Sequence, residues 1–356
     1  MYNILHVYPQ LNCGGTEMVI YNLIKFSDRN RFNYDILVQR TGSNEQIFRE
    51  LGCTIHVVPF NRVDEYKHAL DVFFAAHHYI AVHTHMHEEI PYVLQSAKRY
   101  NVTHRIAHSH NARHDIPLFL WPLRIFKHHK YERYATDMFG CSRMALKWLF
   151  PLKWKQGKVI YNGIDLDKFR FNKQKREEIR KAYGILDGTC VYVNVGRCTD
   201  QKNQKFILQL AEELKNANNL FIIIGDGPLY DNLVKQKDEC HLTNVMLLGK
   251  RDDVADWLCA ADVFLFPSIY EGLGIVAIEA ETSGLQVLAT DSLPEEVDMH
   301  LGNFVPLAVN DKQKWLTAMS VPMIPLGKRT EISDAAFRSH YNIREVSNTV
   351  ETIYQQ

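Results

Sequence analysis

The chain contains 356 residues, of which 46% are hydrophobic and 23% charged, and its 41 Lys and Arg residues balance 41 Asp and Glu residues. This composition is ordinary for a folded protein and excludes a disordered chain, a collagen-like repeat and a small disulfide scaffold. The length exceeds what one hydrophobic core usually organises, so we expect two domains.

The predicted elements alternate between short apolar strands and longer helical segments along the whole chain. In the first half, strands are predicted at 3–8, 34–39, 54–58, 80–84, 104–109 and 157–161, with helices at 16–26, 64–78 and 88–99. The same alternation is repeated in the second half, with strands at 190–195, 219–224, 244–248, 262–266, 286–289 and 303–305 and helices at 201–216, 228–239 and 274–283. A last helical segment covers 342–354.

Several of these strands are apolar runs without polar alternation, which is typical of parallel strands covered by helices on both faces. We therefore predict an α/β protein with two doubly wound Rossmann-like domains, at 1–165 and 166–340, and a C-terminal helix within 341–356 that packs back on the first domain. Ligands bind beyond the carboxyl ends of such strands, so the two domains are expected to face one shared cleft.

The zero net charge hides a division between the two halves. Residues 1–165 hold 20 Lys and Arg against 14 Asp and Glu, whereas residues 166–356 hold 21 against 27. Most of the positive charge lies in 98–158, where 13 basic residues face three acidic ones. Aromatic residues such as Trp148 and Trp154 lie among these cations, a mixture that favours an anionic membrane surface. Nucleic acid is not expected, since no reader motif accompanies the block; a solvated face over core aromatics is the other interpretation.

The cysteines and the N-terminal residues indicate a cytoplasmic protein. The seven cysteines are odd in number and form no C-x-x-C pair, which indicates free thiols in a reducing compartment. The first residues lack the basic and apolar regions of a signal peptide, and no run approaches the ~20 apolar residues that span a bilayer.

The candidate chemistry lies at turns that follow predicted strands. Gly14 and Gly15 follow the first strand and begin a helix, an arrangement that lets the backbone approach an anion. In the second half, strand 190–195 leads into Gly196-Arg197 and then Lys202, which could reach a diphosphate together. Strand 262–266 leads to Glu271-Gly272-Leu273-Gly274 and an apolar helix that contains Glu279. Glutamates are costly in a core, so a ligand hydroxyl is a natural partner for each.

These motifs, in this order, resemble the retaining nucleotide-sugar glycosyltransferases of the GT-B fold, and most closely glycosyltransferase family 4 of bacterial capsule and exopolysaccharide assembly. The resemblance rests on Arg197-x4-Lys202 and Glu271-x7-Glu279. It extends over nearly the whole chain through Gly14-Gly15-Thr16-Glu17, Ser109-His110-Asn111, Asn162-Gly163-Ile164-Asp165, Gly225-Asp226-Gly227-Pro228 and Leu248-Gly249-Lys250. Two departures are Asn203, where a glycine is commoner, and the absence of a glycine pair before Pro294-Glu295.

The resemblance implies a role for each matching residue. Arg197 and Lys202 would neutralise the diphosphate of a UDP-sugar, Glu279 would bind the ribose, and Glu271 would face the transferred sugar. His110 would lie near the reacting centre. The remaining donor-binding residues are Gly14, Gly15, Gly196, Gly225, Lys250, Gly272, Leu273 and Gly274. A hexose or N-acetylhexosamine would pass to a saccharide or polyprenyl-diphosphate-linked acceptor, with no metal and no cofactor, on the inner face of the membrane.

Two other functions stay open at this stage. Histidines recur at 83, 85 and 87 and at 104, 108 and 110, a spacing that could ligate zinc in a metal-dependent hydrolase. Alternatively, each histidine is simply hydrogen-bonded at a strand end. A nucleotide-sugar epimerase or binding protein of the same fold is the third possibility. Asp165 and Asp167 form a D-x-D sequence, but their place at the domain junction predicts a linker in which aspartate caps a turn rather than a metal site.

Overall fold

The computed structural model describes residues 1–12, 14–85, 88–111, 121–215, 217–321 and 323–356. These residues form two compact units, which are described separately. Unit 1 comprises Met1–Ile164 and His340–Gln356, and unit 2 comprises Asp165–Ser339. The boundaries expected from the sequence, 165/166 and 340/341, differ from these by one residue. The six described cysteines are free thiols, as predicted.

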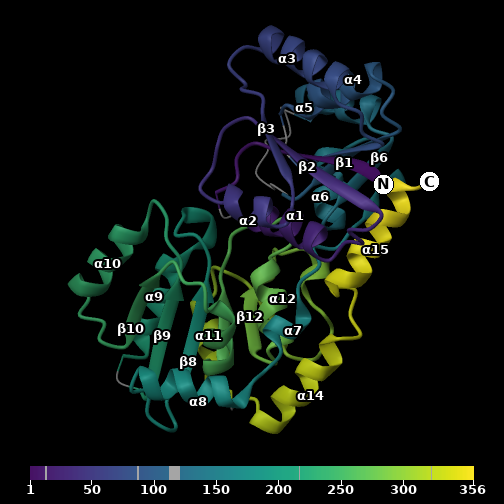
Figure 1. Cartoon of the computed structure of the whole chain (residues 1–356). Coiled ribbons are helices and arrows are strands. Elements are labelled where there is room, and N and C mark those ends of the chain that lie inside the picture. The colour runs from purple at the N-terminus through teal and green to yellow at the C-terminus, as the bar shows by residue number, and fades with distance from the viewer. Residues whose placement is uncertain (13, 86–87, 112–120, 216, 322) are drawn as a thin grey trace. The chain divides into compact units, whose positions relative to one another are not determined.

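Unit 1 contains a parallel sheet whose described strands follow the order β3-β2-β1-β4-β5-β6-β7; β1, β2, β3 and β6 are labelled in Figure 1. The strands are β1 Tyr2–Tyr8, β2 Phe32–Val38, β3 Thr54–Val57, β4 Ala81–Thr84, β5 His104–Ser109, β6 Asp137–Gly140 and β7 Lys158–Val159. The helices are α1 Gly15–Lys25, α2 Glu45–Glu50, α3 Val63–Ala76, α4 Ile90–Arg99, α5 Trp121–Tyr134, α6 Arg143–Leu149 and α15 Ile343–Tyr354.

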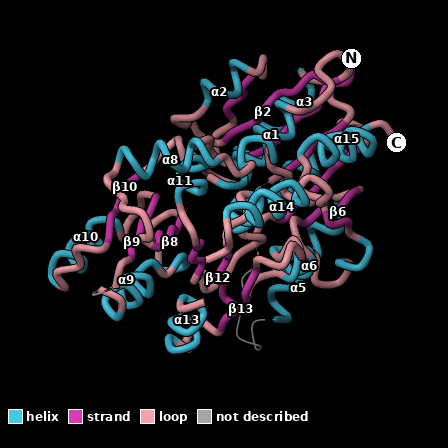
Figure 2. Tube along the Cα trace, turned by 90° about the horizontal axis from the view of Figure 1, so that it is seen from below, coloured by secondary structure: helices cyan, strands magenta, loops and turns pink. Residues whose placement is uncertain are grey.

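The last helix, α15, belongs to unit 1 although the whole of unit 2 lies between it and residues 1–164 in the sequence. It packs against α1, and Ser347 Oγ donates a hydrogen bond to the carbonyl of Leu23 at 3.3 Å. Val346 and Val350 on the same helix are buried. The two chain ends consequently lie near each other in both views (Figures 1 and 2). Burial of this apolar stripe is what fixes the helix to unit 1.

Unit 2 repeats the architecture with a second parallel sheet, whose described strands follow the order β10-β9-β8-β11-β12-β13. The strands are β8 Cys190–Val195, β9 Asn219–Ile224, β10 Val245–Gly249, β11 Val263–Phe266, β12 Gln286–Thr290 and β13 Phe304–Leu307. The helices are α7 Leu166–Phe169, α8 Lys173–Ala182, α9 Gln204–Glu213, α10 Tyr230–Glu239, α11 Val254–Ala260, α12 Ile275–Thr282, α13 Lys312–Met319 and α14 Leu326–Ala336.

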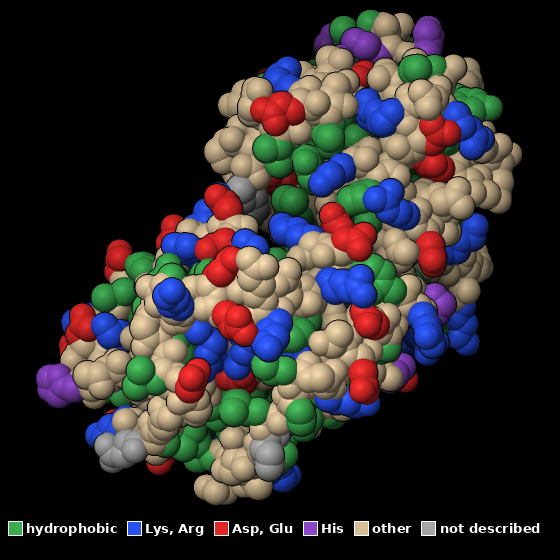
Figure 3. Space-filling view, turned by 60° about the horizontal axis from the view of Figure 1, so that its bottom comes forward, with side chains coloured by type: hydrophobic (Ala, Val, Ile, Leu, Met, Phe, Trp, Pro, Cys, Tyr) green, Lys and Arg blue, Asp and Glu red, His purple; other side chains and the backbone are tan. Residues whose placement is uncertain are grey.

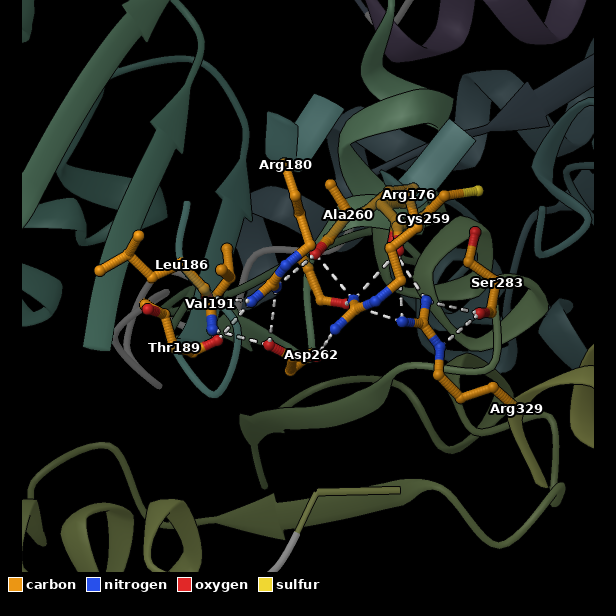
Figure 4. Close-up of polar contacts among 12 residues, drawn as sticks. Arg176, Arg180, Leu186, Thr189, Val191, Cys259, Ala260, Asp262, Ser283 and Arg329 are labelled. Carbon is orange, nitrogen blue, oxygen red and sulfur yellow. Dashed lines mark hydrogen bonds and ion pairs between the residues drawn. The ribbon is translucent and has the colours of Figure 1, made fainter. Parts of the chain in front are cut away.

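Two arginines from different helices close the carboxyl end of α11 in unit 2 (Figure 4). Arg176 of α8 donates to the carbonyls of Ala260 and Ala261 at 2.8 Å and pairs with Asp262 at 2.6 Å. The fully buried Arg329 of α14 donates to the Ala261 carbonyl at 2.7 Å. Cations at a helix carboxyl end satisfy its free carbonyls and its dipole. Burial lowers the pKa of Arg329 to about 9, so these carbonyls hold a guanidinium that remains charged at neutral pH.

Each predicted strand exists, within three residues at either end, but some elements were missed. Strand β6 was not predicted, nor were eight of the described helices, among them α8, whose segment 173–182 has the composition of a polar stretch. No residue of α8 is fully buried, so it has no apolar stripe from which a helical period could be recognised. Its inward contacts are made by arginines instead, which a hydrophobicity pattern does not register.

Candidate functional site

Most of the predicted donor-binding residues lie on two loops at one edge of the unit 2 sheet. Gly196 and Arg197 follow β8, and the short 3-10 helix Asp200–Lys202 ends at the predicted lysine. The other loop, with Glu271, runs from β11 to α12. Because β8 and β11 are hydrogen-bonded neighbours and parallel, the carboxyl ends of both strands meet at this edge.

Hydrogen bonds join these two loops directly. Ile269 N donates to the Gln201 carbonyl at 2.8 Å, and Gln201 Nε2 donates to the Tyr270 carbonyl at 2.8 Å. Asn203 Nδ2 donates to the Pro267 carbonyl at 3.2 Å, and its backbone is left-handed, with φ of 54°. This conformation explains why glycine is common at that position and why asparagine is tolerated there. Sequence reasoning did not identify Gln201, because nothing in the local pattern marks a contact with residues 69 positions away.

Lys202 and Glu271 form the charged centre of this site. Lys202 Nζ lies 2.5 Å from Glu271 Oε1 and 5.3 Å from the centre of the Phe266 ring, while the lysine stem passes Gly196. Glu271 is 8% exposed. Arg197 is exposed, and it forms no ion pair with a carboxylate among the described residues. The loop thus presents one paired cation and one cation that is accessible to an anion.

Glycines allow the neighbouring loops to approach this centre. Gly225, after β9, has a φ of 146°, and a Cβ at this position would lie 2.0 Å from the Gly196 carbonyl oxygen. Gly274 is the N-cap residue of α12 and has a φ of 95°. Gly272 and Leu273 lie in the sequence between Glu271 and this helix, and both are buried. Lys250, by contrast, is exposed and directly follows β10, which is three strands away from β11 in the sheet order.

The helix that follows, α12, carries two glutamates in different environments. Burial raises the pKa of Glu279 to about 8, and the Lys168 ammonium acts in the opposite direction. A carboxyl group with this pKa is largely protonated at neutral pH and can donate as well as accept a hydrogen bond. Glu281 is fully buried and accepts from the Met299 backbone amide at 3.2 Å, which is a contact internal to the fold.

In unit 1, the Gly14-Gly15 turn is held by a carboxylate. Glu17 is 1% exposed and accepts hydrogen bonds from Asn12 N at 2.5 Å, Gly14 N at 3.3 Å and Asn44 Nδ2 at 2.9 Å. Gly14 caps α1, whose first residue is Gly15. The capping arrangement was not predicted, although glutamate at the third helical position is the sequence signal for it.

His110 belongs to a cluster of five histidines from three neighbouring strands. His6 lies opposite His83 in the pairing of β1 with β4, and His83 lies opposite Ile106 in the pairing of β4 with β5. Side chains two residues apart point to the same face of a strand, so the cluster gathers on one face at the carboxyl edge of the sheet. Its members are His6, His83, His85, His108 and His110.

The cluster contains two hydrogen-bonded chains. His6 Nδ1 lies 2.8 Å from His85 Nε2, and His85 Nδ1 lies 2.8 Å from His110 Nε2. In the second chain, His83 lies 3.0 Å from His108 and 2.6 Å from the Tyr354 hydroxyl of α15. The sequence flagged four of these histidines but not His6.

Burial sets the charge of these histidines. It lowers the pKa of His6 to about 3, and it lowers the pKa values of His83, His85 and His108 well below the usual 6.5. The four imidazoles are therefore neutral at physiological pH and can ligate a metal. One ring nitrogen from each member lies within 4.8 Å of the others in two groups, His6–His83–His85 and His85–His108–His110.

His87 lies outside the described residues, and His104 lies at the opposite end of β5, where it faces Asp137 at 3.6 Å. The prediction for 83, 85 and 87 therefore stays a prediction, and the two histidine groups among the described residues each draw on two neighbouring strands and the turns that follow them. Asp165 accepts a hydrogen bond from Lys168 N and caps the short helix α7, where the sequence predicted a capped turn.

The basic block 98–158 is only partly described, since residues 112–120 and the side chains of 121–124, 126 and 127 lie outside the description. Phe150 is fully buried, and Trp154 packs on the core beneath Lys147, whose Nζ lies 4.6 Å from the indole centre. These aromatics therefore belong to the protein interior or are covered by lysine. On the face seen in Figure 3, Lys and Arg are mixed with Asp and Glu.

No described helix has the length and apolar character needed to cross a membrane.

Comparison with known proteins identifies related chains. Residues 175–300 match the family described as glycosyl transferases group 1. The Bacillus subtilis glycosyltransferase EpsF is 30% identical over 86% of this chain and 84% of its own length. An Escherichia coli UDP-Gal:alpha-D-GlcNAc-diphosphoundecaprenol alpha-1,3-galactosyltransferase is 34% identical over 37% of this chain and 36% of its own. Among solved structures, Anabaena HepE with UDP and glucose superposes with a TM-score of 0.84, at 17% identity and 100% coverage of both chains. That structural likeness shows the two-domain GT-B fold, and none of these proteins supports the hydrolase alternative.

Proposed function

Because the chain belongs to the group 1 glycosyltransferases, we propose that it transfers a hexose or N-acetylhexosamine from a UDP-sugar to a saccharide or polyprenyl-diphosphate-linked acceptor during cell-surface polysaccharide assembly. The observation that carries the proposal is the Lys202–Glu271 pair with the exposed Arg197, at the edge where β8 and β11 end. Two relatives support the choice of substrates. HepE was crystallised with UDP and glucose, and the E. coli relative uses UDP-Gal and a diphosphoundecaprenol-linked sugar.

The donor diphosphate is proposed to bind at Arg197 and Lys202. Arg197 offers an exposed guanidinium fork, and Lys202 exchanges part of its contact with Glu271 for a phosphate oxygen. The glutamate carboxylate is then available to a hydroxyl of the sugar. Positive side chains and the amides of Gly272–Gly274 offset the charge that develops on the leaving UDP, so the reaction requires neither a metal nor a cofactor.

The other donor contacts come from α12 and from unit 1. Glu279, protonated at neutral pH, is proposed to hold the ribose by donating to one hydroxyl and accepting from another. Gly14 and Gly15, held by Glu17, are proposed to contact the diphosphate, and His110 the reacting sugar. The acceptor hydroxyl attacks C1 from the face that UDP leaves and gives its proton to the leaving phosphate, so the anomeric configuration is retained.

The basic block 98–158 is proposed to bind an anionic membrane surface at the cytoplasmic face. Lys147, Lys155 and Lys158 are exposed, and cations near an anionic surface contribute roughly 1 kcal/mol each. Vesicles of phosphatidylglycerol should therefore float the protein at low salt and release it at high salt. Equal flotation with phosphatidylcholine vesicles would contradict this electrostatic account.

Donor binding is tested by calorimetry with UDP and a panel of UDP-sugars, with Lys202→Met compared with Lys312→Met. Both lysines form a 2.5 Å ion pair in unit 2, but the Lys312–Glu213 pair is exposed and lies on α13 and α9. The Lys202 variant should bind UDP at least about tenfold more weakly, since it loses a charge-assisted contact, while the Lys312 variant should be unchanged. Equal binding by both variants would refute the assignment.

Transfer itself is tested by UDP release in the presence of lipid-linked saccharide acceptors, with and without EDTA. We expect release that EDTA does not reduce, and a product whose new linkage keeps the donor anomeric configuration by NMR. Binding of a UDP-sugar without UDP release would indicate a binding protein, and isomerised donor would indicate an epimerase.

A further inference from the structure

The histidine cluster of unit 1 exceeds what the proposed transfer reaction uses. His110 has a role in that reaction, whereas His6, His83, His85 and His108 have none. We propose that His85, His108 and His110 form a binding site for a transition-metal ion of the zinc class. One ring nitrogen from each of the three lies within 4.8 Å of the other two. Imidazole nitrogen is the commonest protein ligand of such ions, and three histidines with one open position form a known type of zinc coordination.

The distance between the His85 and His110 nitrogens requires only a small change for a metal to enter. Zinc–nitrogen bonds of about 2.0–2.1 Å in tetrahedral geometry place neighbouring ligand nitrogens about 3.3 Å apart. His85 Nδ1 and His110 Nε2 lie 2.8 Å apart, so they need to separate by about half an ångström. The ring centres of His85 lie 5.1 Å from His110 and 5.4 Å from His108, and those of His108 and His110 lie 4.0 Å apart.

The surrounding hydrogen bonds already orient the ligands. His108 Nδ1 contacts His83 Nε2, and His83 Nδ1 contacts the Tyr354 hydroxyl, while His85 Nε2 contacts His6 Nδ1. If His108 and His85 donate through these nitrogens, His108 Nε2 and His85 Nδ1 carry lone pairs toward the metal. His108 Nε2 is buried and has no partner among the described residues. Metal-binding histidines usually donate their second N–H in this manner, which fixes the ring and its tautomer.

The outer group is preferred to the inner one because an ion can reach it. His6 and His83 are fully buried and His85 is 3% exposed, so the inner group lies beneath the surface. His110 alone among the five is partly exposed. An inner metal on His83 Nε2 would also break the contact with His108 that orients the outer ligand.

A metal ion bound at this histidine site would inhibit sugar transfer rather than support it. This consequence rests on the proposed function. The metal would hold His110 Nε2, the group proposed to face the reacting sugar. Metal binding itself is independent of that proposal, because it needs neither donor nor acceptor.

The test uses the full chain stripped with EDTA and dialysed against zinc, with bound metal measured by mass spectrometry and cobalt used as a spectroscopic substitute. We expect one equivalent of zinc, and a cobalt complex with the visible absorption of a tetrahedral nitrogen site. His110→Asn should lower the zinc affinity at least about tenfold, the lower end of the loss seen for supporting residues. His129→Asn, which removes a histidine of unit 1 whose side chain is 57% exposed, should not.

Absence of stoichiometric zinc in the unmodified chain, or equal affinity in both variants, overturns the proposal. The partly exposed His110 is chosen because substitution there leaves the buried histidines in place, and thermal unfolding checks that the variant folds. If the His110→Asn variant does not fold, the cobalt spectrum of the unmodified chain is the test, because a spectrum without tetrahedral bands also overturns the proposed metal site. UDP calorimetry on the same samples reports donor binding separately.

Discussion

The four buried histidines of unit 1 should make its stability fall steeply in mild acid. Burial holds the pKa of His6 at about 3 and those of His83, His85 and His108 well below 6.5, the value to which they return on unfolding. Below pH 6.5 the unfolded chain thus binds protons that the folded chain does not. Stability is then lost as the pH falls, which is the sign required when the folded pKa is depressed for a histidine.

The size of the effect follows from proton linkage. Each group that stays neutral when folded loses RT ln(1 + 10^(6.5 − pH)) of stability, which is about 1.4 kcal/mol at pH 5.5. Four such groups lose about 6 kcal/mol between pH 8 and pH 5.5, a large part of the 5–15 kcal/mol that holds a typical domain folded. Glu351 opposes this slightly, because burial raises the pKa of its carboxyl group.

Unit 2 supplies an internal comparison of opposite sign. The pKa of Glu279 is raised to about 8 and that of Glu281 is raised well above 4.5, both by burial. A raised carboxyl pKa lowers stability as the pH rises from 4.5 through the folded pKa. Unit 2 should therefore gain stability over the same acid shift in which unit 1 loses it.

The assay is hydrogen exchange with mass spectrometry on the chelator-treated chain at pH 8 and pH 5.5, corrected for intrinsic exchange. Peptides from β1 and β4 report unit 1, and peptides from β8 and β11 report unit 2. Protection in unit 1 should fall by about four orders of magnitude, the equivalent of about 6 kcal/mol. Unchanged or increased protection in unit 1 at pH 5.5 would refute the conclusion that these histidines are buried and neutral.

Three further variants test other parts of the structure. Gly225→Ala should destabilise unit 2 by about 1–3 kcal/mol or more, because the new Cβ would meet the Gly196 carbonyl oxygen. Gly302→Ala should cost less stability, because Gly302 also has a positive φ but lies in open space. Equal losses of stability in urea titrations of the two variants would show that backbone strain alone matters. Glu17→Ala removes the buried acceptor of two partly buried hydrogen bonds from backbone amides and should cost unit 1 about 2 kcal/mol, and an unchanged unfolding midpoint would contradict that role. Glu279→Gln should lessen the fall in the stability of unit 2 between pH 5 and pH 8, because the amide does not titrate whereas Glu281 still does; an unaltered decline would assign the pH dependence to other groups.

The sequence alone determined much of the fold and of the unit 2 site. Apolar runs without alternation placed the strands, and the positions of Arg197, Lys202 and Glu271 directly after strands placed them at one sheet edge. That inference works because the carboxyl ends of parallel strands share an edge, whichever the strand order. The cap formed by Asp165 was likewise predictable, because it depends on residues three positions apart.

Tertiary structure decided what depends on strand order, register and burial. Only the pairing of β1 with β4, and of β4 with β5, brings His6 to His83 and turns scattered histidines into one cluster. Likewise, the sequence was equally compatible with a membrane-binding role for the aromatic residues around Trp154, whereas the structure shows that they pack on the core. A local pattern records which residues alternate, but not which distant strand lies beside them or which side chains cover them. For this protein, the sequence determined where the groups that bind a diphosphate follow their strands, and the tertiary structure decided which of its histidines are buried, neutral and within reach of one another.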